Sequence, residues 1–136
     1  MANEAVIIEL LGNGGDPIRY TVADGTGVEK GTIMKINTGD RLIIATSADG
    51  DFPMGIAASE KVANDGSTTL AVYTNGIFDL TVHGTNTVTL GYPVKIDGVN
   101  LISDADEAGA TAPSEVIGQA LEAGAANEVI AVRVLK

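Results

Sequence analysis

Short runs of β-branched residues, interrupted every few positions by glycine, asparagine or aspartate, limit the fold of this chain more than any other feature. The runs include AVIIELL, IRYTVA, RLIIAT, TTLAVYT and EVIAVRVL, and the interruptions include GNGGDP, DGTG, SADGDFP and DG. Runs of this length that are bounded by turn residues predict β-strands, because helices in globular proteins need longer uninterrupted segments. The sequence therefore predicts an all-β fold of many short strands, either a compact barrel or a sandwich.

One pattern occurs twice in the chain. VEKGTIMKI at residues 28–36 and VTLGYPVKI at residues 88–96 both fit V-x-x-G-x-x-[MV]-K-I. Each copy is followed by a Gly-x-Ala segment and then by a strand-like run, and the interval from the first valine to the closing run is equal in the two copies. We therefore expect two pseudo-repeated halves, at about 28–73 and 88–133, with each covering the other's apolar face. The alternative is a chance match within a chain rich in Gly, Val and Lys.

Two dipeptides predict tight hairpins. Asn75-Gly76 lies between two β-rich runs and is the strongest hairpin signal in the chain, and Asp97-Gly98 is a second one. Evidence for helix is thin, because glycine and proline interrupt the single segment with helix-forming composition. We expect little helix, with at most a short turn near residues 104–110.

The N-terminal run AVIIELL is apolar on both faces of a strand. Val6, Ile8 and Leu10 would share one face, and Ile7 and Leu11 the other. Such a strand is either covered on both sides within its own fold or lies against a partner, as in β-strand addition. The glycine-rich segment GNGGDP that follows would serve as a hinge in the second case.

Length and charge restrict the domain count and the classes of partner. The 136 residues suit one domain, which we divide into an N-terminal arm or strand at 1–14 and a single β domain at 15–136. The net charge of −10 argues against nucleic acid and anionic membranes, since both select for basic residues. The first residues lack the basic region and long apolar core of a secretory signal. The chain contains no cysteine, which fits synthesis in a cytosol.

Searching the sequence for reactive or ligand-binding groups predicts no catalytic, cofactor-binding or metal-binding residue. His83 is the one histidine, so it has no partner for a transition-metal site or a catalytic triad, and we expect a surface or turn role. Asp49 and Asp51 flank Gly50 without the ligand spacing of a calcium loop, so a turn with solvated carboxylates is favoured over weak Ca²⁺ binding. GNGGDP precedes a strand-like run rather than the helix that a phosphate loop requires. The protein is therefore expected not to be an enzyme.

Three segments carry a resemblance to a known family. GDPIRYTVADGTGVEKGTIMKI, GIAASEKVANDGSTTLAVYTNGIFDL and IGQALEAGAANEVIAVRV resemble small virion proteins of tailed phages that act as capsid decoration, or cement, proteins. The resemblance covers most of the chain, from about Gly15 to Val134, as an overall pattern rather than a catalytic signature. More distantly, the chain is similar to the head decoration protein of lambda-type phages. The resemblance implies a compact barrel-like, or β-tulip, fold that is often a homotrimer.

The same resemblance implies a function. The protein would dock on the outside of an icosahedral phage head and clamp neighbouring major capsid subunits, after synthesis in the host cytoplasm. Its partners would be the major capsid protein of the same virus and further copies of itself. The apolar N-terminus is the candidate capsid contact, consisting of Ala5, Val6, Ile7, Ile8, Glu9, Leu10 and Leu11. Two alternatives stay open: another virion component, such as a tail or head fibre, and a small module that binds glycans or host surfaces, against which the scarcity of aromatic residues argues.

Overall fold

A computed structural model describes residues 3–10, 17–37, 42–105 and 111–136 of the chain. Within these ranges almost all regular structure is β, as the spacing of turn residues predicts, and one short 3-10 helix is present. The elements are β1 (Val6–Leu10), β2 (Ile18–Thr21), β3 (Ile33–Ile36), β4 (Ile43–Ala45), β5 (Pro53–Ala57), β6 (Thr69–Tyr73), β7 (Asn75–Val82), β8 (Pro93–Ile96), β9 (Leu101–Asp104), η1 (Pro113–Glu115), β10 (Val116–Ala120) and β11 (Val129–Leu135).

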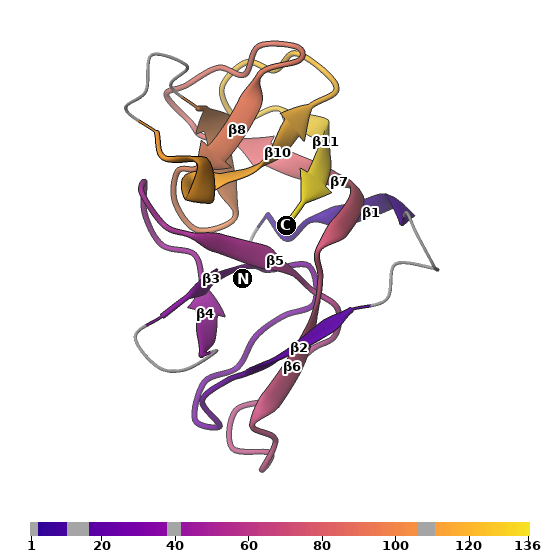
Figure 1. Ribbon diagram of the computed structural model, residues 1–136, viewed down its shortest axis with the longest axis vertical. Coiled ribbons are helices and arrows are strands. Elements are labelled where there is room, and N and C mark those ends of the chain that lie inside the picture. Colours follow the sequence, from indigo (N-terminus) through magenta and orange to yellow (C-terminus); the bar gives the residue numbers. More distant parts are fainter. Residues whose placement is uncertain (1–2, 11–16, 38–41, 106–110) are drawn as a thin grey trace.

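The strands form two sheets that stack along the long axis of the molecule (Figure 1). The first sheet has five strands in the order β2-β6-β5-β3-β4, and the second has six in the order β1-β7-β11-β10-β8-β9. In the second sheet β7 also pairs in parallel with β9, which closes a five-stranded barrel and leaves β1 as an added strand on the remaining edge of β7. In the first sheet a single parallel bridge between Thr21 and Leu42 brings β4 next to β2. The fold is therefore barrel-like rather than a sandwich.

The two barrels share one strand order and one register. The strands of the first sheet correspond one to one with the barrel strands of the second. The order β2-β6-β5-β3-β4 in the first matches β7-β11-β10-β8-β9 in the second. Ile18 pairs with Val72 in the first barrel, and Phe78 pairs with Val132 at the corresponding place in the second. These correspondences support the proposal of two pseudo-repeated halves.

The glycine of the repeated pattern has the same task in both barrels. Gly31 and Gly91 have φ angles of +90° and +83°, a region that side chains other than glycine rarely adopt. The Gly31 N–H donates to the carbonyl of Ala57, and the Gly91 N–H donates to the carbonyl of Ala120. Each glycine therefore makes the turn that leads the chain into β3 or β8.

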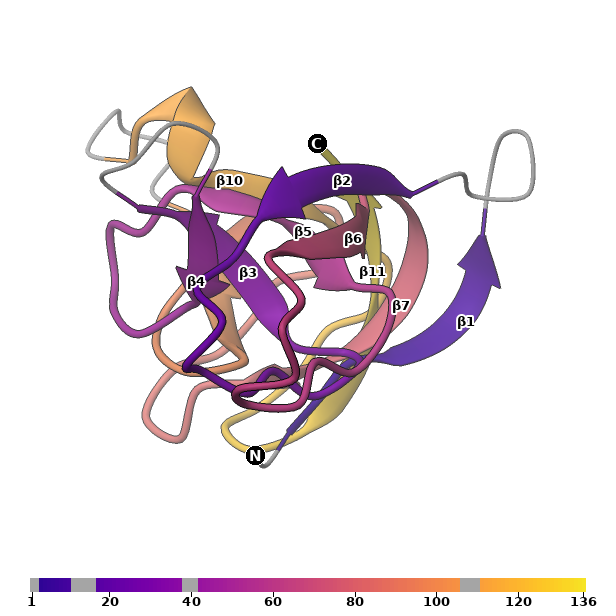
Figure 2. The same ribbon diagram turned by 90° about the horizontal axis from the view of Figure 1, so that it is seen from below.

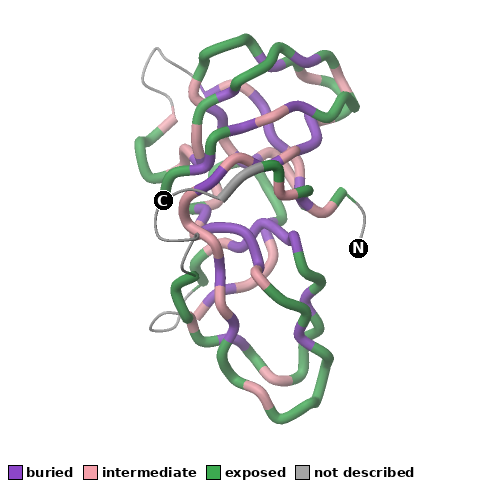
Figure 3. Tube along the Cα trace, turned by 90° about the vertical axis from the view of Figure 1, so that its right-hand side faces the viewer, coloured by how far each residue is buried: buried purple, intermediate pink, exposed green. Residues whose placement is uncertain are grey.

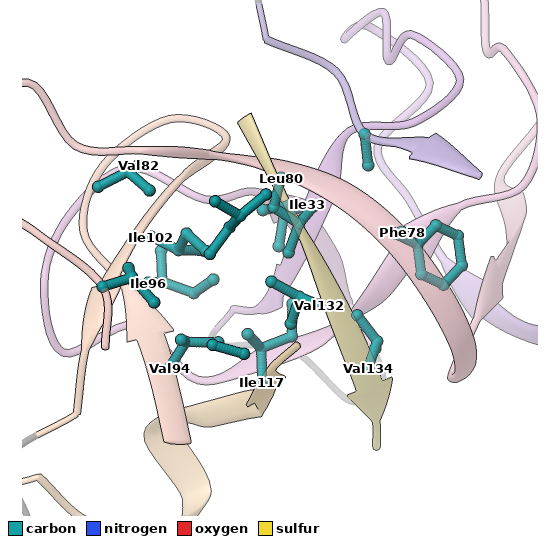
Figure 4. Packing of buried hydrophobic residues seen from close by; sticks show 14 of the residues in the cluster. Ile33, Phe78, Leu80, Val82, Val94, Ile96, Ile102, Ile117, Val132 and Val134 are labelled. Carbon is teal, nitrogen blue, oxygen red and sulfur yellow. The ribbon is translucent and has the colours of Figure 1, made fainter. Parts of the chain in front are cut away.

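The barrels are filled by two clusters of buried aliphatic side chains. Figure 4 shows the larger cluster, in which Phe78 and Leu80 of β7 point toward the same interior as Val132 of β11. Ile33 and Ile56 from the first barrel belong to this larger cluster, so apolar side chains of the two barrels pack directly against each other. Figure 3 shows buried positions along the strands of both barrels and exposed positions at the turns.

One of the two hairpin predictions is wrong. Asp97-Gly98 connects the antiparallel strands β8 and β9, which confirms that hairpin. Asn75-Gly76 begins β7 instead, because β6 ends at Tyr73 in the first sheet and the chain crosses into the second sheet at that point. Most of the helical turn considered near 104–110 lies outside the described residues.

Candidate interaction surface

Strand β1 is part of the fold and still presents apolar side chains to solvent. It pairs antiparallel with β7, as Figure 2 shows at the edge of the molecule. The Ala5 N–H donates to the Gly31 carbonyl at 2.7 Å, and Ile7 packs against the larger core cluster. Val6 and Ile8 lie on the same face, opposite Ile7, and are exposed at 57% and 54%, and a bulge shifts the register with β7 between Ile7 and Glu9.

The seven candidate contact residues therefore divide into groups. Ala5 is buried and Ile7 is half-buried within the protein's own core, so neither is available to a partner. Val6 and Ile8 are available. The side chains of Glu9 and Leu10, and all of Leu11, lie outside what the structure describes.

The exposed side of β1 continues onto β7, β11 and the turn after β10. Val6 lies beside Asp79 of β7, which pairs with Ala131 of β11, and the Leu121 N–H donates to the Ala131 carbonyl at 2.9 Å. Four neighbouring chain segments about 4.8 Å apart give this surface a width of about 14 Å. We call it the apolar face. Its apolar members are Val6, Ile8, Ile77, Leu121, Val129, Ala131 and Leu135, and the charged Asp79 of β7 and Arg133 of β11 lie among them.

Sequence reasoning missed most of this face, although a signal was present. In β11 the residues opposite the buried Ile130, Val132 and Val134 include Val129 and Leu135, which are 56% and 62% exposed. An outward row that is largely apolar on a strand with one buried face indicates that something covers the second face.

The corresponding face of the first barrel is an internal comparison. Its outward positions are Arg19 and Thr21 on β2 and Thr69, Ala71 and Tyr73 on β6. Thr69 corresponds to Val129 of the second barrel, because Thr69 pairs with Thr21 of β2 and Val129 pairs with Thr81 of β7. The difference between these outward rows is confined to single positions: Val129 stands where the first barrel has Thr69, Ala131 and Ala71 are alike, and Arg133 stands where the first barrel has Tyr73.

The lysines of the repeated pattern both bind one acidic turn. Lys35 donates to Asp51 at 2.9 Å, and Lys95 of the other barrel donates to Asp49 at 2.9 Å. Burial alone would raise the pKa of Asp51, but hydrogen bonds from the Ser47 N–H, from Lys35 and from the Ala48 N–H outweigh burial and lower this pKa. The expectation of solvated carboxylates is wrong for Asp51, which is 12% exposed, whereas Asp49 is 57% exposed and is solvated as well as paired with Lys95.

His83 lies at the end of β7, beside a polar groove of about 600 Å³. Its Nδ1 accepts the Thr85 N–H at 3.3 Å, which gives the imidazole the turn role that the sequence predicts. The same groove contains Lys95 and Asp104, and the Asp104 carboxylate accepts both the N–H and the hydroxyl of Thr89. Each of these three side chains is therefore bound within the fold: His83 to Thr85, Lys95 to Asp49 and Asp104 to Thr89.

Lys61 is a buried cation that sequence reasoning missed. Its side chain is 1% exposed, and its ammonium donates to the carboxylates of Asp24 and Asp65 at 3.0 and 2.9 Å. Burial alone would lower the pKa of Lys61, but the hydrogen bonds to Asp65 and Asp24 outweigh burial and raise it. The lysine joins the loop after β2 to the loop before β6.

Within the described ranges, no three histidine, cysteine or acidic residues are placed to hold a metal ion. No helix among those residues is long and apolar enough to cross a bilayer. Most of the glycine-rich segment GNGGDP, considered as a hinge, lies outside the described residues.

Fold and surface together define an all-β protein of two similar barrels, with the apolar face on the second barrel. The family of phage cement proteins matches residues 12–135, and the chain belongs to this family. Among solved structures, the chain is similar to the N base of the head fiber protein gp8.5 of bacteriophage phi29, with a TM-score of 0.55 and 17% identity over 87% of this chain and 93% of that one. This likeness shows a shared fold. Comparison with curated proteins gives no match. The protein is a structural component of a phage virion.

Proposed function

We propose that this protein is a non-enzymatic decoration protein that binds major capsid subunits on the outside of the phage head through the apolar face. The observation that carries the proposal is the group of exposed apolar side chains on neighbouring strands of the second barrel. It includes Val6 and Ile8 of β1, which are 57% and 54% exposed, and Val129 and Leu135 of β11, which are 56% and 62% exposed. Membership of the cement family supports the choice of the capsid as the partner.

The proposed attachment rests on many weak contacts. A net charge of −10 opposes non-specific association between copies, and apolar contacts with the shell would supply the attraction. A homotrimer, as the family resemblance implies, would present three apolar faces at once. Linking several weak sites in this way raises the overall avidity by about 10²–10⁴ over a single site.

The test is co-sedimentation of the purified protein with expanded shells from its source phage that lack it. Wild-type protein should pellet saturably, at a fixed ratio to capsid subunits. Ile8→Lys should weaken pelleting about tenfold or more per contact, because it removes an apolar side chain worth about 1.5–3 kcal/mol when buried. Val62→Lys is the matched control, since Val62 is similarly exposed, at 59%, in a loop of the first barrel. Equal binding by the two variants would contradict the proposed face, and absence of wild-type pelleting would contradict the capsid role.

A head-fibre role is a second candidate, favoured by the fold shared with a head-fiber base over nearly the whole of that chain. In this case the protein would anchor a further fibre component to the head rather than reinforce the shell. Gold-labelled antibody would then mark the protein at the bases of fibres, whereas a decoration protein would be labelled over all faces of the head.

A further inference from the structure

Both barrels contain a hollow at the same place, beside the seam where the first strand of the barrel in chain order meets the third, which is β2 with β4 or β7 with β9. The seam is marked by the parallel pairs Thr21–Leu42 and Thr81–Leu101. In the second barrel the hollow is the polar groove next to His83. In the first barrel it is a smaller pocket lined by Val22, Ala23, Thr26, Gly27, Val28, Ile43, Ile44 and Ala45.

The two hollows differ in chemistry at corresponding positions. Ile44 and Ala45 pair with β3 as Ser103 and Asp104 pair with β8, so the first barrel has apolar side chains where the second has a hydroxyl and a carboxylate. A polar hollow on the surface is satisfied by water. An apolar hollow gains free energy only when an apolar group fills it.

The size of the apolar pocket limits what can fill it. Its floor is made by the buried Val22, Val28 and Ile43, and its mouth by the exposed Ala23 and Thr26. The cavity measures about 90 Å³. An apolar cavity of about 150 Å³ takes up benzene, so 90 Å³ suits about four carbons, which is one leucine side chain.

The chain presents a side chain of this kind on the other barrel. Leu90 lies in the turn that leads into β8 and is 62% exposed. It precedes Gly91, whereas Lys30 precedes the corresponding Gly31 in the first copy of the pattern. At this turn the second copy of the pattern therefore exposes an apolar side chain where the first copy has a charged one.

We propose that Leu90 of one copy of this protein inserts into the apolar pocket of the next copy. Neither Leu90 with its neighbours Thr89, Gly91 and Tyr92 nor the described lining of the pocket carries a charged side chain, so insertion of Leu90 would bury no charge. Because Leu90 and the apolar pocket lie on different barrels, the contact between copies is head-to-tail. Head-to-tail contacts close into rings when the rotation between copies permits it. The contact thus supplies self-association independently of the capsid.

The absence of native cysteine makes disulfide trapping a direct test. Thr26→Cys, at the pocket mouth, and Leu90→Cys are prepared as separate chains of different size, mixed and mildly oxidised. We expect mixed disulfide dimers, and a covalently closed ring of measurable mass when both substitutions are on one chain. Leu135→Cys is the control, since Leu135 has the same 62% exposure but lies on the apolar face. The proposal predicts that Leu90→Cys forms a disulfide with Thr26→Cys faster than Leu135→Cys does. Equal rates of disulfide formation would overturn it.

Analytical ultracentrifugation of Leu90→Lys gives a second readout. This variant has the residue of the corresponding position, Lys30, and should remain folded by circular dichroism. We expect the concentration of half-association to rise about tenfold or more per contact. A wild-type protein that stays monomeric at all concentrations, with Leu90→Lys weakened only in shell binding, would assign Leu90 to the capsid and overturn contact between copies. Ile8→Lys tests the capsid role separately, so failure of one idea is distinguishable from failure of the other.

Discussion

Two aspartates of the acidic turn each bind the lysine of one barrel: Asp51 binds Lys35 within the first barrel, and Asp49 binds Lys95 of the second. Asp51 accepts hydrogen bonds from the Ser47 and Ala48 N–H groups and from Lys35, whereas Asp49 binds only Lys95 among the described residues. Asp51 is largely shielded, with its side chain 12% exposed, and Asp49 is open to solvent at 57%. Hydrogen bonds to a shielded carboxylate stabilise more than an exposed ion pair does.

Replacing Asp51 by alanine should therefore cost about 1.5–3 kcal/mol of unfolding free energy, the range for hydrogen bonds to a charged group. The pKa of Asp51 is lowered in the folded state, so its contribution is present above the ordinary pKa of an aspartate and is lost as the pH falls through the folded value. Urea unfolding at pH 7 and at pH 2.5 measures both effects. Asp49→Ala is the control and should cost less than about 1 kcal/mol. Equal costs for the two variants would show that the turn does not depend on Asp51.

At the scale of strands, the spacing of β10 and β11 depends on a glycine. Gly118 pairs with Val134, and a Cβ built on Gly118 would lie 1.9 Å from the carbonyl oxygen of Arg133. Gly55 has the corresponding place in the first barrel, where a Cβ would lie 2.4 Å from the carbonyl oxygen of Tyr73. The obstacle is backbone in both cases, so a side chain would have to push the strands apart.

Gly118→Ala should destabilise the protein by about 2 kcal/mol or more, in the range of strain and overpacking within a core. Gly66→Ala is the control, since Gly66 has a φ of +84° but no atom within 4 Å of a built Cβ. It should cost only about 1 kcal/mol, from the backbone conformation alone. Thermal unfolding followed by circular dichroism measures both, and a smaller loss for Gly118→Ala would mean that β10 moves freely against β11.

The positions that sequence reasoning identified correctly are those with local causes. Asp97-Gly98 makes its hairpin because the turn and both strands are adjacent in the chain. Asn75-Gly76 carries an equal local signal, but the strands on its two sides pair in different sheets, and the tertiary arrangement overrides the dipeptide. The exposed row on β11 carried a local signal in Val129 and Leu135, but an alternating strand does not reveal whether its second face meets solvent, its own fold or a partner.

For the whole molecule, one buried asparagine connects the two barrels. The Ile33 N–H donates to Asn100 Oδ1 at 2.8 Å, and the Asn100 N–H donates to Thr46 Oγ1 at 3.4 Å. Asn100 is fully buried and has a φ of +55°, which asparagine tolerates better than most residues. It belongs to the β8–β9 hairpin, and its partners belong to the first barrel.

Asn100→Gly keeps this backbone conformation available but leaves the buried Ile33 N–H without its acceptor. We expect a loss of about 1–3 kcal/mol, the cost of a buried unsatisfied group, and a loosened contact between the barrels. Urea unfolding followed by hydrogen exchange at amides of each barrel measures this coupling. Wild-type protein should unfold in one transition, and the variant should protect the two barrels unequally. Unchanged stability would show that the shared apolar cluster alone joins the barrels.

The sequence by itself determined the all-β class, the repeated glycine turn before β3 and β8, and the apolar character of β1, because each depends on neighbouring residues. Only the tertiary structure decided that β1 pairs with β7, that Asp49 and Asp51 bind the two lysines of the repeated pattern, and that the apolar face lies on one barrel. These features join residues far apart in the chain. Pairing and exposure at such distances follow from how whole sheets close and stack, and no local pattern encodes them.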